Sequence, residues 1–113
     1  MEIKVEQAGA AVRIGLAGRL DASTASGVEE TFLAWVGQGA KAFVFDLSGL
    51  EYISSAGLRV MLLAAKKMRS AGGKLALFGL GETVREVFEI SGFHTIFAIF
   101  GSEDDALAFV GNP

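Results

Sequence analysis

The stretch Asp46-Leu-Ser-Gly-Leu-Glu-Tyr-Ile-Ser-Ser-Ala-Gly-Leu58 predicts the end of a buried strand, a short loop and the start of a helix. An apolar run over residues 42–45 precedes it, and apolar residues at helical spacing follow it as far as Met68. Ser54 and Ser55 therefore fall where the helix begins. The first N–H groups of a helix have no intrahelical partners, and the helix dipole makes that end slightly positive. A serine there can be a structural cap or a site for phosphate.

The same alternation of strand and helix patterns continues on both sides of this stretch. Strands are predicted at residues 3–6 and 12–16, which form a hairpin, and at 42–47, 74–78 and 95–100. Helices are predicted from a cap at Ser23 or Thr24 to Gly37, from Ser55 to about Ala71, over 82–91, and over 106–110 after a capping box at 102–105. This order indicates one α/β domain over residues 1–113. We expect a small, mostly parallel sheet, mixed at its N-terminal edge, with about four helices packed mainly on one face.

Composition excludes several classes of protein. With 113 residues, one domain is expected. The mean hydropathy is +0.46, yet the longest apolar runs fall far short of the roughly 20 residues of a membrane-spanning helix. The N-terminus lacks the pattern of a signal peptide, and there are no cysteines for disulfides or metal ligation. We therefore expect a cytoplasmic protein of bacterial type that is not embedded in a membrane.

The charge pattern argues against a nucleic-acid partner. The net charge is −3 and the pI about 5.1, whereas a nucleic-acid-binding domain shows a basic stripe and a high pI. The nearest approach to such a stripe is Lys66, Lys67 and Arg69, which the sequence predicts to be a solvated helix face.

Residues for catalysis are missing from the sequence. His94 is the single histidine, no Ser-His-Asp spacing is visible, and Ser55 lacks the flanking glycines of a nucleophile elbow. Gly79-Leu-Gly81 matches a dinucleotide fingerprint only in part. We therefore expect no enzyme activity, no catalytic residue, no metal and no cofactor.

Two acidic residues lie where a ligand or partner could bind. Asp21 and Asp46 follow two predicted strands, and the carboxyl ends of parallel strands form one edge of a sheet. Both would then lead to the same surface as the two serines. The alternative interpretation is that each acid caps its own loop.

Three motifs resemble a known family. They are Gly18-Arg-Leu-Asp-Ala-Ser-Thr-Ala25, Phe45-Asp-Leu-Ser-Gly-Leu-Glu-Tyr-Ile-Ser-Ser-Ala-Gly-Leu-Arg59, and the pattern Val84-x-x-Val-Phe-x-Ile-Ser-Gly-Phe93. Together they resemble a STAS domain of the type found in bacterial anti-sigma-factor antagonists, and the resemblance covers essentially the whole chain. The family pattern Asp-Ser-(Ser/Thr)-Gly-Leu aligns its acceptor serine with Ser55. Ser54 stands in place of the acid, and Ala56 in place of the following hydroxyl residue.

The resemblance implies a protein-binding switch. Such antagonists bind an anti-sigma factor that is a serine kinase with its own ATP and magnesium, and thereby free a sigma factor. Phosphorylation of the acceptor, here Ser55 with Ser54 as the alternative, ends the binding, and a serine phosphatase restores it. The residues implied in partner binding are Asp21, Ser23, Ser54, Ser55, Ala56, Gly57, Leu58 and Arg59.

Other interpretations remain open on the sequence alone. Some STAS proteins are constitutive accessory subunits of ATP-driven lipid transporters, and in these the serine need not be phosphorylated. Phe93, Phe97 and Phe100 could cover the core or form an apolar patch for a partner or a weak homodimer.

Overall fold

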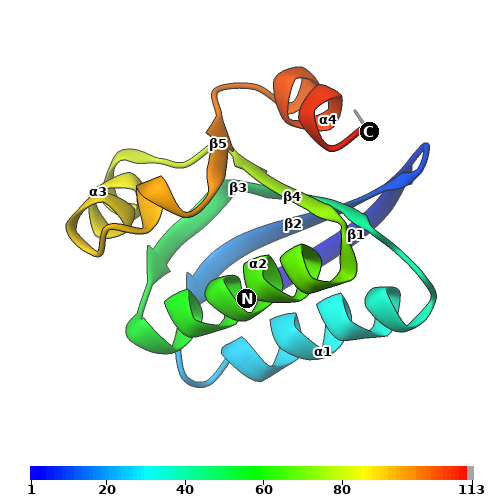
Figure 1. Cartoon of the computed structure of the whole chain (residues 1–113). Helices are drawn as coiled ribbons and strands as arrows, with labels where there is room; N and C mark the ends of the chain where they lie inside the picture. Colours follow the sequence, from blue (N-terminus) through cyan, green and yellow to red (C-terminus); the bar gives the residue numbers. More distant parts are fainter. Residues whose placement is uncertain (112–113) are drawn as a thin grey trace.

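The computed structural model describes residues 1–111 and confirms the predicted order of elements (Figure 1). The strands are β1 (Glu2–Ala8), β2 (Ala11–Leu20), β3 (Ala42–Ile53), β4 (Lys74–Phe78) and β5 (Ala98–Phe100). The helices are α1 (Ala25–Gly37), α2 (Ser55–Ala71), α3 (Glu82–Ile90) and α4 (Glu103–Gly111), with a 3₁₀ turn, η1 (Phe93–Thr95). The last two residues of the predicted domain, Asn112 and Pro113, lie outside the described residues.

The strands form one five-stranded sheet in the order β1-β2-β3-β4-β5. The β1–β2 pair is antiparallel and the other pairs are parallel, as expected for a sheet mixed at its N-terminal edge. Because crossovers between parallel strands are right-handed, strands added in one direction place their connecting helices on one face. Helices α1, α2 and α3 follow this rule. Helix α4 comes after the last strand and covers the opposite face (Figure 1).

The sheet separates two apolar cores. The larger core lies between the sheet and α1, α2 and α3, and its centre includes the rings of Phe32 and Phe43, 4.7 Å apart. The smaller core lies under α4, where Ala106 and Val110 pack on Val44 and Ala76. Helix α4 begins at Glu103, three residues before the predicted range of 106–110, and the predicted cap is present, since Ser102 Oγ accepts a hydrogen bond of 3.2 Å from the Asp105 N–H.

Strand β3 is longer than the sequence predicts. We expect a loop after Leu47, but the strand continues to Ile53 and pairs with β2. The β2–β3 register shifts twice, between Gly15 and Ala17 and between Gly18 and Arg19. These bulges break the alternation of buried and exposed residues that marks a regular strand, so the pattern after Leu47 resembles a loop.

The region after α3 differs from the predicted strand over residues 95–100. Only Ala98–Phe100 form a strand, and the chain before it makes the 3₁₀ turn. Phe97 is buried, and Phe93 packs edge-on against Phe88 at 6.3 Å. Phe100 lies on the other face beside Phe109, with ring centroids 5.4 Å apart. The three phenylalanines therefore contribute mainly to the two cores.

Candidate partner-binding site

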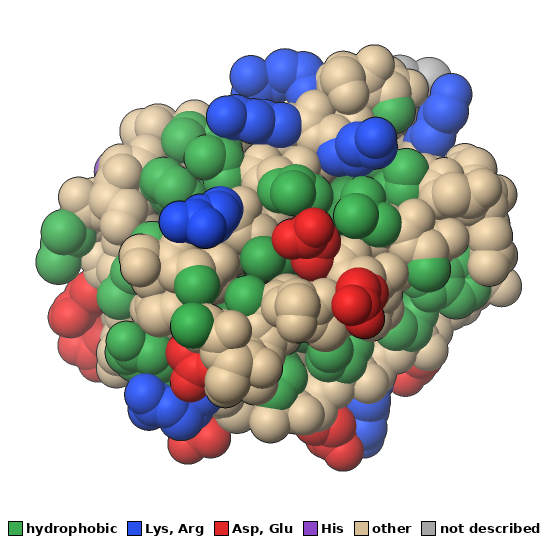
Figure 2. Space-filling view, turned by 90° about the horizontal axis from the view of Figure 1, so that it is seen from below, with side chains coloured by type: hydrophobic (Ala, Val, Ile, Leu, Met, Phe, Trp, Pro, Cys, Tyr) green, Lys and Arg blue, Asp and Glu red, His purple; other side chains and the backbone are tan. Residues whose placement is uncertain are grey.

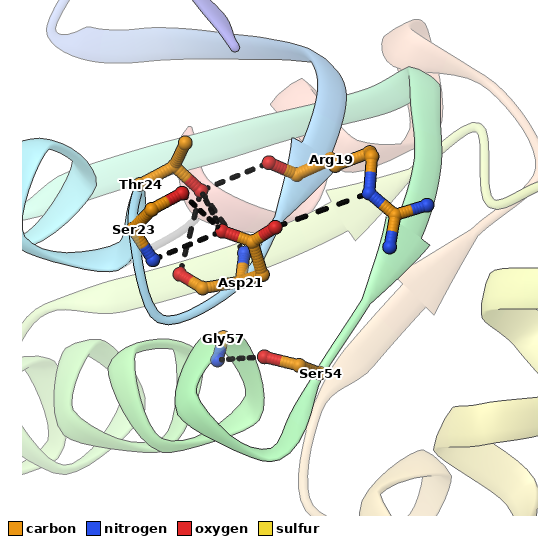
Figure 3. A network of polar contacts seen from close by, with 6 residues as sticks. All are labelled: Arg19, Asp21, Ser23, Thr24, Ser54 and Gly57. Carbon is orange, nitrogen blue, oxygen red and sulfur yellow. Dashed lines mark hydrogen bonds and ion pairs between the residues drawn. The ribbon is translucent and has the colours of Figure 1, made fainter.

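The candidate site forms where β2 and β3 end side by side. Leu20 and Ile53 are partners in the parallel pair, and the Ser54 N–H donates to the Leu20 carbonyl at 2.9 Å. The turn after β2 and the start of α2 therefore lie next to each other (Figure 3). The structure thus brings together Asp21 and Ser23 with the predicted stretch from Ser54 onward.

The two serines at the start of α2 have different environments. Ser54 is the N-cap, with extended backbone, and its Oγ accepts a hydrogen bond of 3.4 Å from the Gly57 N–H (Figure 3). Ser55 is the first helical residue and is exposed. Its hydroxyl has no hydrogen-bond partner among residues 1–111. Ser54 therefore does the capping, and the Ser55 hydroxyl faces solvent.

Gly57 faces the core of its own domain. A Cβ at this position would lie 2.8 Å from Leu20 Cγ, 2.8 Å from Ile53 Cγ1 and 2.9 Å from the Leu20 carbonyl oxygen. The residue is buried, so the packing of α2 against the ends of β2 and β3 requires a glycine there. The sequence placed Gly57 among the partner-binding residues, and the structure adds a structural reason for its identity.

The other predicted residues of α2 divide by exposure. Ala56 and Leu58 are half-buried and pack against the larger core. Arg59 is exposed, one turn after Ser55. The accessible part of this stretch is therefore centred on Ser55 and Arg59.

Asp21 organises the neighbouring turn. Its Oδ1 accepts hydrogen bonds from the Ser23 hydroxyl at 2.7 Å and the Ser23 N–H at 3.0 Å. The Thr24 hydroxyl accepts from the Asp21 N–H and donates to the Arg19 carbonyl, each at 2.9 Å. Thr24 is the N-cap of α1 by position, but its side chain makes no capping hydrogen bond, because its hydroxyl is already bonded to the Asp21 N–H and the Arg19 carbonyl. The hydrogen bonds from Ser23, and then the charge of Arg19, hold the pKa of Asp21 below its usual value.

An NMR titration of the side-chain carboxyls should therefore give Asp21 a pKa below the usual value of about 3.9. Ser23→Ala removes the hydroxyl that lowers this pKa most, so it should raise the pKa of Asp21. Because the folded-state pKa is depressed, the ionised turn stabilises the fold above the unfolded-state pKa. That contribution is lost as the pH falls through the folded-state value. Ser70→Ala, which removes an exposed hydroxyl on α2, is the matched control. An Asp21 pKa that Ser23→Ala leaves unchanged would contradict this assignment.

Sequence reasoning missed two residues beside the site, Arg19 and Tyr52. They are partners in the β2–β3 pair, and the Arg19 guanidinium lies over the Tyr52 ring at 4.1 Å from its centroid. Arg19 Nε is also 3.9 Å from Asp21 Oδ2 (Figure 3). Arg19 lies two residues before Asp21, and Tyr52 lies two residues before Ser54. Aligning the two motifs as parallel strands would have placed these two residues side by side, next to the predicted site.

The prediction that Asp46 leads to the same surface as the serines is wrong. Asp46 lies within β3, seven residues before its end, on the sheet face that α4 partly covers. Its Oδ2 is 2.6 Å from Arg13 Nη2, and Arg13 Nε is 3.0 Å from Glu103 Oε1. Arg13 therefore links Asp46 in the sheet to Glu103 at the start of α4. The cause of the error is the unexpected length of β3.

Two further features bear on function. Within residues 1–111, no cluster of His, Asp or Glu side chains has the arrangement needed to hold a metal ion. Over the same range, no helix combines the length and hydropathy that crossing a membrane requires.

Two curated relatives cover most of the chain. BtrV of Bordetella bronchiseptica, a candidate anti-sigma factor antagonist, is 47% identical over 93 residues, which cover 82% of this chain and 80% of BtrV. An anti-sigma-B factor antagonist of Listeria monocytogenes is 33% identical over 94 residues, covering 83% of this chain and 82% of the relative.

Solved structures share the fold at lower identity. A candidate anti-sigma factor antagonist from Thermotoga maritima superposes with a TM-score of 0.91 at 22% identity, covering 97% of this chain and 95% of that one. The anti-sigma factor antagonist SpoIIAA in its unphosphorylated form gives a TM-score of 0.83 at 23% identity, covering 96% of each chain. Phosphorylated SpoIIAA from Bacillus gives 0.75 at 22% identity, covering 96% and 99%.

The family model described as the STAS domain matches residues 2–106. This match spans the three motifs that suggested the resemblance, and the relatives align over most of the same range. The chain therefore belongs to the STAS domain family.

Proposed function

We propose that this protein is an anti-sigma-factor antagonist. It binds an anti-sigma factor that is also a serine kinase, which frees a sigma factor, and phosphorylation of Ser55 ends the binding. The names of two relatives at 47% and 33% identity support the first part of this proposal. In this role the protein is a binding module and not an enzyme. ATP and magnesium belong to the kinase, and a separate serine phosphatase restores the active form.

The observation that carries the proposal is the difference between Ser54 and Ser55. The Ser54 hydroxyl receives the hydrogen bond that caps α2, while Ser55 is exposed at the first position of the helix. A kinase can therefore reach the Ser55 hydroxyl without breaking a hydrogen bond of the fold. Phosphorylation at Ser54 would instead disturb the cap, which supports Ser55 as the acceptor.

Phosphate on Ser55 would act on the partner more than on the fold. It adds about −1.5 to −2 charges at neutral pH. The first turn of α2 contains no acidic residue, so within the helix this charge meets the positive end of the helix dipole. The domain should therefore remain folded. At the binding surface, the same charge must be desolvated and is repelled by the phosphates of the nucleotide in the kinase.

Mass spectrometry of the protein purified from its native cells tests this proposal. We expect phosphate on Ser55 under some growth conditions, and an anti-sigma factor that co-purifies with the unphosphorylated form. Ser55→Ala should bind this partner as the parent does but stay unphosphorylated, whereas Ser54→Ala should still be phosphorylated. If Ser55 is unmodified under every condition and a lipid transporter co-purifies, the proposal is wrong, and the constitutive-subunit interpretation replaces it.

A further inference from the structure

The outer face of α2 carries a row of basic side chains that begins next to Ser55. Helix α2 contains four of the ten Lys and Arg residues of the chain and none of its thirteen Asp and Glu residues. At 3.6 residues per turn, side chains three and four positions apart share one face. This spacing places five residues on one line, opposite the buried face of the helix: Ser55, Arg59, Leu62, Lys66 and Arg69.

The basic side chains of α2 form no ion pair with any acidic group of residues 1–111. All three ion pairs found within residues 1–111 involve Arg13 or Arg19. The four cations of α2 are exposed, and Glu29 and Glu30 on the adjacent helix α1 pair with none of them. Figure 2 views the molecule from the side of α1 and α2. It shows basic side chains gathered along one border of this face, with hydrophobic side chains between them. The positive charges of α2 are therefore available to a binding partner.

Apolar surface lies among these charges. Leu62 and Leu63 are half-buried and help to line a shallow, wide-open groove of about 540 Å³ on the surface of α2. The rest of the groove is lined by Arg59, Lys66, Lys67 and Ser70. An apolar strip bordered by unpaired cations matches a helix with apolar residues in its centre and carboxylates beside them.

We infer that this groove is the docking site for an acidic amphipathic helix of a protein partner. The inference rests on the proposed function, because it takes the anti-sigma factor as the protein that carries this helix. Apolar side chains of the partner helix cover Leu62 and Leu63, while its Asp and Glu residues pair with the cations of α2. The inference extends the binding surface from the start of α2 along most of its length.

The composition of this face favours a protein over a membrane or a nucleic acid. A helix that lies on a membrane presents a broad apolar face, but that face of α2 is buried in the core and only two leucines border the groove. The net charge of −3 opposes approach to the phosphate backbone of a nucleic acid. A short acidic helix, by contrast, contacts only α2, so the local positive charge of this helix is sufficient to attract it.

Ser55 connects the groove to the proposed switch. Ser55 and Arg59 are four residues apart on the same face, so a phosphate on Ser55 partly neutralises the basic row where it begins. It also adds negative charge in the path of an acidic helix. Phosphorylation therefore weakens docking along α2 as well as contact at the phosphate itself.

Titration of the isotope-labelled full chain by NMR tests the inference. The probe is a synthetic helical peptide with leucines on one side and glutamates beside them, compared with the same peptide carrying glutamine in place of glutamate. Shifts should be confined to α2 from Arg59 to Ser70 and should need the glutamates. Lys66→Glu with Arg69→Glu should weaken binding at least tenfold. Lys4→Glu with Lys41→Glu changes the net charge equally at exposed positions off α2, and should leave binding unchanged.

Several results would overturn the inference. These are shifts outside α2, equal binding of the glutamine peptide, equal effects of the two charge reversals, or binding of phosphatidylglycerol vesicles in preference to the peptide. If the charge reversal destabilises the end of α2, the neutral variant Lys66→Gln with Arg69→Gln replaces it in the titration.

The same variants, measured against the anti-sigma factor, separate the two proposals. If the kinase phosphorylates Ser55 but binds the reversed variant as tightly as the control, the docking site is wrong and the proposed function stands. If no kinase binds the parent protein, the proposed function is wrong, and the peptide titration alone decides whether the groove binds an acidic helix.

Discussion

Ser55→Asp is expected to weaken binding to the anti-sigma factor about a hundredfold, which corresponds to about 3 kcal/mol. The substitution puts a fixed negative charge at an exposed position on the first turn of α2. When the partner covers this position, the charge must be desolvated beside other negative groups, and like charges placed together in an interface cost several kcal/mol. The fold itself should tolerate the change, since an acid at a helix N-terminus is favourable. Isothermal titration calorimetry with the purified partner measures the effect.

Ser55→Asn is the matched control for this prediction. Asparagine has nearly the shape of aspartate but no charge, so it separates charge from size. We expect Ser55→Asn to bind within a few-fold of the parent protein. If the Asp and Asn variants bind equally well, charge is not what ends the complex, and the switch must act through the size of the phosphate.

Gly57→Ala is expected to lower the free energy of unfolding by about 2 kcal/mol. The new Cβ would lie 2.8 Å from both Leu20 Cγ and Ile53 Cγ1, and 2.9 Å from the Leu20 carbonyl oxygen. That carbonyl already accepts the hydrogen bond from the Ser54 N–H, so relief of the clash moves the start of α2 away from β2. The gain of about 1 kcal/mol in helix propensity from glycine to alanine offsets only part of this cost. Urea denaturation measures the change.

The control is Gly37→Ala, at the last residue of α1. A Cβ at Gly37 would meet no atom within 4 Å, and so the variant should be as stable as the parent or more stable. Equal stability of the Gly57 and Gly37 variants would show that α2 does not pack tightly against the strand ends. The clash also predicts that Gly57→Ala weakens partner binding indirectly, because it displaces the turn that carries Ser55.

Local patterns in the sequence predicted most of the elements and the position of the two serines. Helices and strands leave their period in the apolar residues, and glycines such as Gly72, with φ +74°, mark where helices end. The N-cap at Ser54 is equally local, since the hydroxyl and the N–H that it accepts are three residues apart. These contacts join near neighbours in the chain, so the sequence alone determined them.

The tertiary structure decided which side chains share a surface. Arg13 and Asp46 are 33 residues apart, and the pairing of β3 with β2 as far as Ile53 leaves Asp46 within the strand and not at its end. The requirement for glycine at position 57, the stacking of Arg19 on Tyr52 and the unpaired cations of α2 likewise depend on elements far apart in the chain. A sequence pattern reports the period of one element. The register between strands, and the presence or absence of a partner for each charge, are properties of the assembled fold.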